Sequence, residues 1–321
     1  MKNWIGIDPS YESFSSAFPI DAKAYRTEDF PQDEVGFEAF FAQLSPDAKV
    51  IVEDTGSFNS QLVLFLFKRG VSVHVASSQQ INGFRTMTGS RAKNDALDAI
   101  AIARYGEMMA PEAWKPKEDF VVELRQLTAT VSLLVKQRTA LKNQRFSFRL
   151  HPQTPKIILN TINQALEDLK FNIKKLEKSI EQLVKKHLAQ PAKLLRSIPG
   201  LGERIVPAIL AVVPDFSQFE TARQLAAYVG LTPTTFRSGK SVRKTSKLSK
   251  IGPAYLRSVL YMGACNAIQH NPLCKPVYEK MINNGKNKHK AIMAVAHKLV
   301  RIAFAVVKNN QPFDPNFLAK T

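Results

Sequence analysis

The sequence predicts a mixed α/β domain, then a long helical hairpin, then a mainly helical C-terminal region. Short apolar runs alternate with helical patterns over the first 110 residues, heptad repeats occupy the middle, and helical patterns dominate the rest. The chain has 321 residues, of which 45% are hydrophobic and 22% charged, so it has enough apolar material for more than one core. We expect the domain limits at 1–112, 118–190 and 191–321.

The first domain is expected to form a mixed sheet covered by helices. Apolar and β-branched runs predict its strands, and apolar residues at helical spacing predict its helices. The predicted strands are Trp4–Ile7, Ser13–Phe18, Ala22–Arg26, Val50–Val52 and Val71–Val75, and the predicted helices are Ser60–Arg69 and Lys93–Tyr105.

Two heptad runs predict the hairpin. Apolar residues recur at alternating steps of three and four, and the HPQTP segment separates the runs because prolines do not continue a helix. We favour a protruding coiled coil that dimerises over two core helices of a bundle, because the faces outside the seams read as polar. The seam residues are Leu124, Leu127, Val131, Leu134 and Leu141, then Ile162, Leu166, Leu169, Ile173, Leu176, Ile180 and Leu183.

The C-terminal region contains a glycine-containing turn and a basic loop. Gly200 and Gly202 lie in a segment similar to a helix-hairpin-helix element, whose backbone N–H groups can bind a phosphate, or they form a plain turn between helices. The segment Phe236–Ser246 predicts a polar, basic loop, and Ala291–Val307 predicts an amphipathic helix.

The positive charge of the chain is concentrated after residue 110. The net charge is +18, yet residues 1–110 hold 10 basic and 14 acidic residues. No acidic residue occurs from Thr221 to Tyr278. Such a basic surface attracts a polyanion, so we expect nucleic acid, and double-stranded DNA in particular, as the partner. The candidate contacts are Arg237, Lys240, Arg243, Lys244, Lys247, Lys250 and Arg257, with the backbone at Gly200 and Gly202.

Composition excludes several other classes of protein. Two cysteines cannot form a disulfide framework or a four-cysteine zinc site. No apolar stretch approaches the roughly 20 residues of a membrane span, and an acidic residue interrupts the short apolar run near the first residue. We therefore expect a soluble, intracellular protein that has no membrane partner and no secretory signal.

Four acidic residues form a candidate metal site. Asp8 and Glu53 each end a predicted strand, and Asp95 and Asp98 share one face of a predicted helix. Like charges at this helical spacing repel each other, and a divalent cation would convert that repulsion into ligation. We expect Mg²⁺, with Mn²⁺ as an alternative, and we interpret Asp54 as a supporting residue rather than a ligand. A pair of such ions promotes phosphoryl transfer.

These motifs resemble the DEDD transposases of bacterial insertion sequences, the bridge-RNA-guided serine recombinases, whose relatives include pilin-gene invertases. The resemblance covers nearly the whole chain. Its motifs are Gly6-Ile7-Asp8, Val52-Glu53, Ser90–Ala99, Ser197–Gly202, Ala227–Pro233, Arg237–Lys240 and Ser249–Arg257. Pro9-Ser10-Tyr11 departs from the pattern, because family members often carry a small residue and a lysine after the first aspartate.

The resemblance implies an RNase H-like, RuvC-type N-terminal domain whose acids Asp8, Glu53, Asp95 and Asp98 bind Mg²⁺. It also implies a C-terminal transposase domain with Ser238 as the nucleophile. Family members act as dimers and tetramers, combine the acids of one protomer with the serine of another, and choose DNA by pairing to a structured non-coding RNA. Their location is the bacterial cytoplasm, at the nucleoid.

Three hypotheses about function remain open from the residues. The first is an enzyme, a transposase or site-specific DNA recombinase that joins Ser238 transiently to a DNA phosphate. A serine hydroxyl needs an activator, and none of the six histidines has triad or metal spacing, so a bound metal would supply it. The second is a junction-resolving nuclease using metal-activated water, or a protein-guided invertase. The third is a non-enzymatic nucleic-acid-binding protein.

Overall fold

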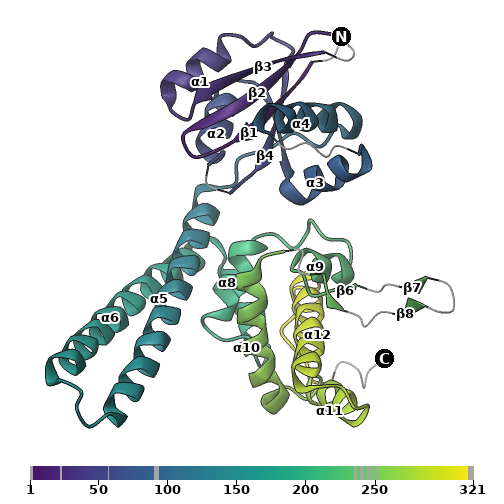
Figure 1. Ribbon diagram of the computed structural model, residues 1–321. Helices are drawn as coiled ribbons and strands as arrows, with labels where there is room; N and C mark the ends of the chain where they lie inside the picture. The colour runs from purple at the N-terminus through teal and green to yellow at the C-terminus, as the bar shows by residue number, and fades with distance from the viewer. Residues whose placement is uncertain are drawn as a thin grey trace. The chain divides into compact units, whose positions relative to one another are not determined.

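The computed structural model describes residues 3–21, 24–56, 58–89, 94–234, 237–238, 242–243, 247–249 and 252–316. These residues form two compact units, Met1–Lys117 and Glu118–Thr321 (Figure 1). The first unit is a mixed α/β structure, and the second is mainly helical, so the predicted fold class is confirmed at this level.

The first unit contains a five-stranded sheet in the order β3-β2-β1-β4-β5. Strand β1 pairs antiparallel with β2 and parallel with β4, and β4 pairs parallel with β5. The strands are β1 (Trp4–Pro9), β2 (Ser13–Pro19), β3 (Tyr25–Pro31), β4 (Lys49–Asp54) and β5 (Ser72–Ser77). The helices are α1 (Glu34–Phe41), α2 (Ser60–Lys68), α3 (Ser78–Met87) and α4 (Asp95–Met109).

Alternation along the strands gives the sheet two apolar faces. Ile5 and Ile7 of β1 belong to a phenylalanine-rich core cluster with residues of α1 and α2. Trp4 of β1 and Ile51 of β4 point to the other face, where they cluster with residues of α3 and α4. The sheet therefore lies between two helical layers (Figure 1).

Three local features of this unit differ from the prediction. The third strand begins at Tyr25, not Ala22, because the Ile20 amide donates to the Ala24 carbonyl at 2.9 Å and closes the β2–β3 turn. Helices α1 and α3 were not predicted. The start of α3 carries a capping box, in which Ser77 accepts from the Gln80 amide and the Gln80 side chain accepts from the Ser77 amide.

The second unit is built from eight helices and four two-residue strands in the part of the chain that the structure describes. No helix among the described residues combines the length and hydrophobicity that crossing a bilayer requires. The helices are α5 (Asp119–Leu150), α6 (Lys156–His187), α7 (Ala189–Arg196), α8 (Ile205–Val212), α9 (Ala222–Tyr228), α10 (Ala254–His270), α11 (Lys275–Asn283) and α12 (Lys288–Lys308). The strands are β6 (Pro233–Thr234), β7 (Arg237–Ser238), β8 (Val242–Arg243) and β9 (Lys247–Leu248).

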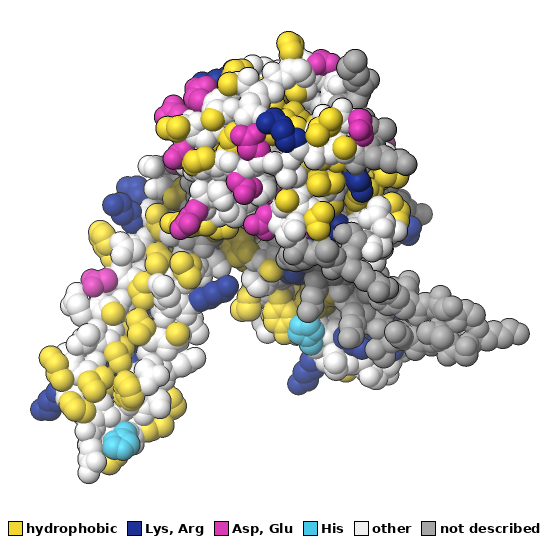
Figure 2. Space-filling view, turned by 45° about the horizontal axis from the view of Figure 1, so that its top comes forward, with side chains coloured by type: hydrophobic (Ala, Val, Ile, Leu, Met, Phe, Trp, Pro, Cys, Tyr) yellow, Lys and Arg dark blue, Asp and Glu magenta, His cyan; other side chains and the backbone are white. Residues whose placement is uncertain are grey.

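Helices α5 and α6 form a hairpin whose facing sides carry the heptad residues. All seven seam positions of α6, from Ile162 to Leu183, are buried or half-buried. The outer faces are less polar than the sequence analysis expected, because Phe146, Leu150 and Phe171 are 67%, 70% and 70% exposed. Figure 2 shows hydrophobic side chains along the surface of this hairpin.

Candidate functional site

Strands β1 and β4 hold Asp8 and Glu53 as neighbours. The strands are parallel, and Ile7 pairs with Val52, so the next residue of each strand lies at the same edge of the sheet. Glu53 lies two residues after Ile51 and Asp8 four residues after Trp4, so both acids point to the face that α3 and α4 cover.

Gly6 brings α4 against this face at close range. A Cβ atom on Gly6 would lie less than 3.0 Å from the Ala99 carbonyl oxygen and from the Ala103 amide nitrogen, which are backbone atoms of α4. Two residues earlier in β1, the Trp4 ring packs against Gly106 of α4, where a Cβ atom would lie 2.5 Å from the ring. Helix α4 therefore runs antiparallel to β1, and its first turn reaches Asp8.

The first turn of α4 supplies Asp95 and Asp98. The side chain of Asn94 caps the helix by accepting a hydrogen bond of 2.7 Å from the Leu97 amide. Asp95 is exposed and Asp98 is buried. Two acids in a first helical turn repel each other but interact favourably with the helix dipole, which partly offsets the repulsion.

The electrostatics of Asp8 show that the four acids are close enough to interact. Burial raises the pKa of Asp8, and the charges of Glu53, Asp98 and Asp95 raise it further, so that it reaches about 7. The positive charge of Arg85 opposes this rise. The structure thus places Glu53, Asp95 and Asp98, three of the acids that the sequence analysis selected, close enough to Asp8 for their charges to act on it.

Asp98 forms an ion pair with Arg85 of α3, and both side chains are largely buried. Among the described residues, no three His, Cys, Asp or Glu side chains are arranged to hold one metal ion. The donor set nevertheless fits Mg²⁺ or Mn²⁺, because it is entirely carboxylate and because burial and the charges of the neighbouring acids raise the pKa of Asp8, a cost that a bound cation would relieve. Arg85 escaped the sequence analysis, because its helix was not predicted and only the tertiary fold brings it to Asp98.

Asp54 and Asn59 support the end of β4. The Asp54 carboxylate is exposed and accepts a hydrogen bond of 3.1 Å from the Gly56 amide, which stabilises the turn after the strand. Buried Asn59 donates to the Glu53 carbonyl at 3.1 Å. Both side chains therefore act on the backbone that carries Glu53.

The predicted nucleophile and basic contacts belong to the second unit. Arg237 and Ser238 form β7, whose backbone pairs antiparallel with β8, Ser238 opposite Val242 and Arg237 opposite Arg243 in the register. The segment predicted as a loop thus contains two short paired strands. Lys247 lies on β9. Lys240, Lys244 and Lys250 lie outside the described residues.

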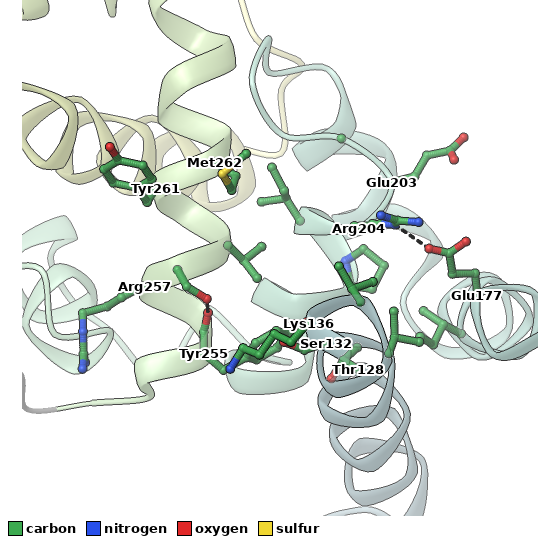
Figure 3. A pocket seen from close by; sticks show the side chains of 18 of the residues that line it. Thr128, Ser132, Lys136, Glu177, Glu203, Arg204, Tyr255, Arg257, Tyr261 and Met262 are labelled. Carbon is green, nitrogen blue, oxygen red and sulfur yellow. Dashed lines mark hydrogen bonds and ion pairs between the residues drawn. The ribbon is translucent and has the colours of Figure 1, made fainter. Parts of the chain in front are cut away.

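Gly200 and Gly202 have different environments. Gly200 has a φ of +107°, and a Cβ atom there would meet the Ala267 Cβ of α10 at 2.6 Å, so the backbone conformation and the packing both require glycine. Gly202 has open space around it and borders a cavity of about 1660 Å³ between the hairpin base, α8 and α10 (Figure 3). Lys136, Arg204 and Arg257 also line this cavity, and Arg204 is paired with Glu177.

Clustered carboxylates at strand ends, in a chain with a basic helical unit, are typical of metal-dependent enzymes that act on nucleic-acid phosphodiesters. Residues 192–279 match the model of the IS116/IS110/IS902 transposase family, and residues 5–148 match a transposase model of the DEDD type. The chain is 30% identical to the pilin gene-inverting protein of Moraxella lacunata, over 98% of both chains. It is 24% identical to the transposase for insertion sequence element IS1111A of Coxiella burnetii, over 82% of this chain and 79% of that one.

The chain belongs to the IS110/IS116 family of DEDD transposases, enzymes that recombine DNA. This result confirms the predicted transposase class and the predicted DNA partner.

Proposed function

We propose that this protein is a site-specific DNA recombinase whose catalytic acids are Asp8, Glu53, Asp95 and Asp98. The observation that carries the proposal is geometric: β1 and β4 are paired so that Asp8 and Glu53 lie at one edge of the sheet, and α4, which carries Asp95 and Asp98, packs against Gly6 of β1. Similarity along nearly the whole chain to pilin gene-inverting proteins supports inversion of a DNA segment, and the transposase matches support movement of an element.

The four carboxylates are proposed to hold Mg²⁺ or Mn²⁺ within an RNase H-like, RuvC-type domain. The bound ion supplies positive charge that stabilises a phosphodiester under attack and activates the attacking hydroxyl. The protein contributes the fixed spacing of the carboxylates, since α4 is packed on β1 through Gly6.

Ser238 is proposed as the nucleophile. Its Oγ forms a bond to the DNA phosphorus and loses its proton, while the bond from phosphorus to one deoxyribose oxygen breaks and that oxygen takes a proton. Attack by a DNA hydroxyl on the phosphoserine then restores a phosphodiester and frees the serine. Because one phosphoester replaces another at each step, no external energy source is needed. Arg237, Lys240 and Arg243 are proposed to neutralise the phosphate.

The remaining regions are proposed to organise the nucleic acid and the assembly. We assign DNA and guide-RNA binding to the basic residues of 191–321, including Lys244, Lys247, Lys250 and Arg257, and to the backbone at Gly202. The 118–190 hairpin is proposed to join protomers into dimers and tetramers as a coiled coil, a role that its exposed Phe146, Leu150 and Phe171 support. The acids of 1–112 then act with the serine of another protomer on bacterial nucleoid DNA.

The serine assignment is tested by trapping covalent protein–DNA adducts with the full-length protein, DNA and Mg²⁺. We expect Ser238→Ala to abolish the adduct while DNA binding persists, and the neighbouring Ser241→Ala to retain it. An adduct that survives Ser238→Ala refutes the assignment. Cleaved ends without any adduct in the wild-type protein favour the second candidate, hydrolysis by metal-activated water, which the DEDD acids also support.

The guide RNA is tested by purifying the protein from its own cells in moderate salt and sequencing the RNA that accompanies it. One enriched, structured RNA encoded beside the gene supports guided recombination. Heterogeneous RNA that salt removes indicates binding by charge alone and favours a protein-guided invertase.

A further inference from the structure

Arg85 places a permanent positive charge inside the acidic cluster. It lies in the last turn of α3, reaches across to α4, and pairs with the Oδ1 atom of Asp98. The two side chains are only 14% and 7% exposed, so water screens the pair weakly. Two other arginine pairs among the described residues of the first unit, Arg26 with Glu28 and Arg69 with Glu38, are far more exposed.

This ion pair stabilises the buried carboxylate of Asp98 in the metal-free protein. A buried carboxylate without a partner is strongly unfavourable, and the charge of Asp98 also interacts with that of Asp8. Arginine remains charged at all physiological pH values, so deprotonation of the guanidinium does not remove the positive charge from this pair. The guanidinium therefore supplies, in the metal-free protein, part of the charge that a divalent ion would supply.

In this position Arg85 and a metal ion would compete for the same carboxylate. A cation bound to Asp98 would share one carboxylate with Arg85, which contacts the Oδ1 atom, and two cations at one buried carboxylate repel each other. We propose that Arg85 is an internal counter-cation that competes with divalent metal for Asp98, so that the site binds metal more weakly while Arg85 pairs with this carboxylate. The inference rests on the proposed metal site, and it concerns how readily that site fills.

A purely positioning role makes the opposite prediction. If Arg85 only oriented Asp98 for ligation, its loss would weaken metal binding, as the loss of groups that orient ligands does. Competition instead requires that metal binding become tighter when the guanidinium is removed. The sign of the change therefore separates the two roles.

The experiment measures Mn²⁺ binding to the full-length protein, without nucleic acid, from the electron paramagnetic resonance signal of free Mn²⁺. We expect Arg85→Gln to bind Mn²⁺ about tenfold more tightly than the wild type, by removing an opposing charge beside a ligand. Arg85→Lys keeps a cation and is expected to stay within about threefold of the wild type. Arg69→Gln, the matched control, removes an arginine of the same unit that pairs with Glu38 and is expected to leave the affinity unchanged.

Unchanged or weaker Mn²⁺ binding by Arg85→Gln, with clear binding by the wild type, overturns the inference and leaves the proposed metal site intact. Binding by Arg85→Gln but not by the wild type supports strong competition. Absence of binding in both overturns the metal site and the inference together. If Arg85→Gln does not fold without metal, thermal unfolding decides, because competition requires that Mn²⁺ restore its folding and raise its melting temperature more than that of the wild type.

Discussion

Gly6→Ala tests the packing that builds the acidic cluster. The added Cβ atom would lie 2.9 Å from the Ala103 Cα and closer still to the Ala99 carbonyl oxygen and the Ala103 amide. All three are backbone atoms of α4, so no side-chain rotation relieves the overlap, and the helix must move away from β1. Overpacking of this kind costs about 1–3 kcal/mol, and we take the upper part of this range because backbone must shift.

The expected loss can be stated as a melting temperature. Replacing glycine by alanine also lowers the conformational entropy of the unfolded chain, which stabilises the folded protein by about 0.4–1 kcal/mol. The net loss in the free energy of unfolding is therefore about 2 kcal/mol. For a unit of this size, that loss lowers the melting temperature by roughly 8 °C. Because α4 carries Asp95 and Asp98, we also expect weaker recombination at a temperature where the variant remains folded.

Differential scanning calorimetry of the full-length protein measures the effect, with Gly83→Ala as the matched control. Gly83 lies inside α3, is exposed, and has open space where its Cβ would be, so this change should stabilise the protein by about 0.5–1 kcal/mol. The two changes are chemically identical and are predicted to have opposite signs. A Gly6→Ala protein that melts at or above the wild-type temperature would refute the reasoning.

The other predictions concern Asp8 and Asn94. Burial and the neighbouring acids raise the pKa of Asp8 from 3.8 to about 7, so the folded protein keeps a proton that the unfolded chain has already lost between these pH values. The contribution of this group to metal-free stability is therefore full below pH about 4 and is lost as the pH rises through about 7. Melting temperatures measured in a chelator should show this decline, and Asp8→Asn should flatten it while abolishing recombination; an equally steep decline in the variant would contradict the assignment. Asn94→Ala should cost about 1 kcal/mol by removing the cap of α4, whereas Asn94→Ser should retain most of the stability, and equal losses in the two variants would count against the capping role.

Much of the site could be predicted from local sequence patterns. The apolar runs before Asp8 and Glu53 placed both acids at strand ends, and the spacing of Asp95 and Asp98 placed them on one helical face. The heptad pattern predicted the buried face of the hairpin in the same way. Each of these features depends on the geometry of a single strand or helix, which repeats every two or about 3.6 residues and is therefore visible in the sequence.

Two other local predictions failed, each for its own reason. The strand predicted at Ala22–Arg26 is displaced to Tyr25–Pro31, because pairing with β2 sets its register. The outer face of the hairpin was expected to be polar, yet large hydrophobic residues are exposed there. Heptad analysis identifies the residues of the seam, but it does not take account of single apolar residues elsewhere on the helices.

The sequence by itself determined which acids end strands, which share a helical face, and where the positive charge is concentrated, because these properties are local or additive. Only the tertiary structure decided that α4 lies against β1 at Gly6, that Arg85 neutralises Asp98, and that the pKa of Asp8 rises to about 7. These three facts depend on contacts between residues that are distant in the chain. Burial and Coulomb interactions act through space, so neither can be evaluated before the elements are packed.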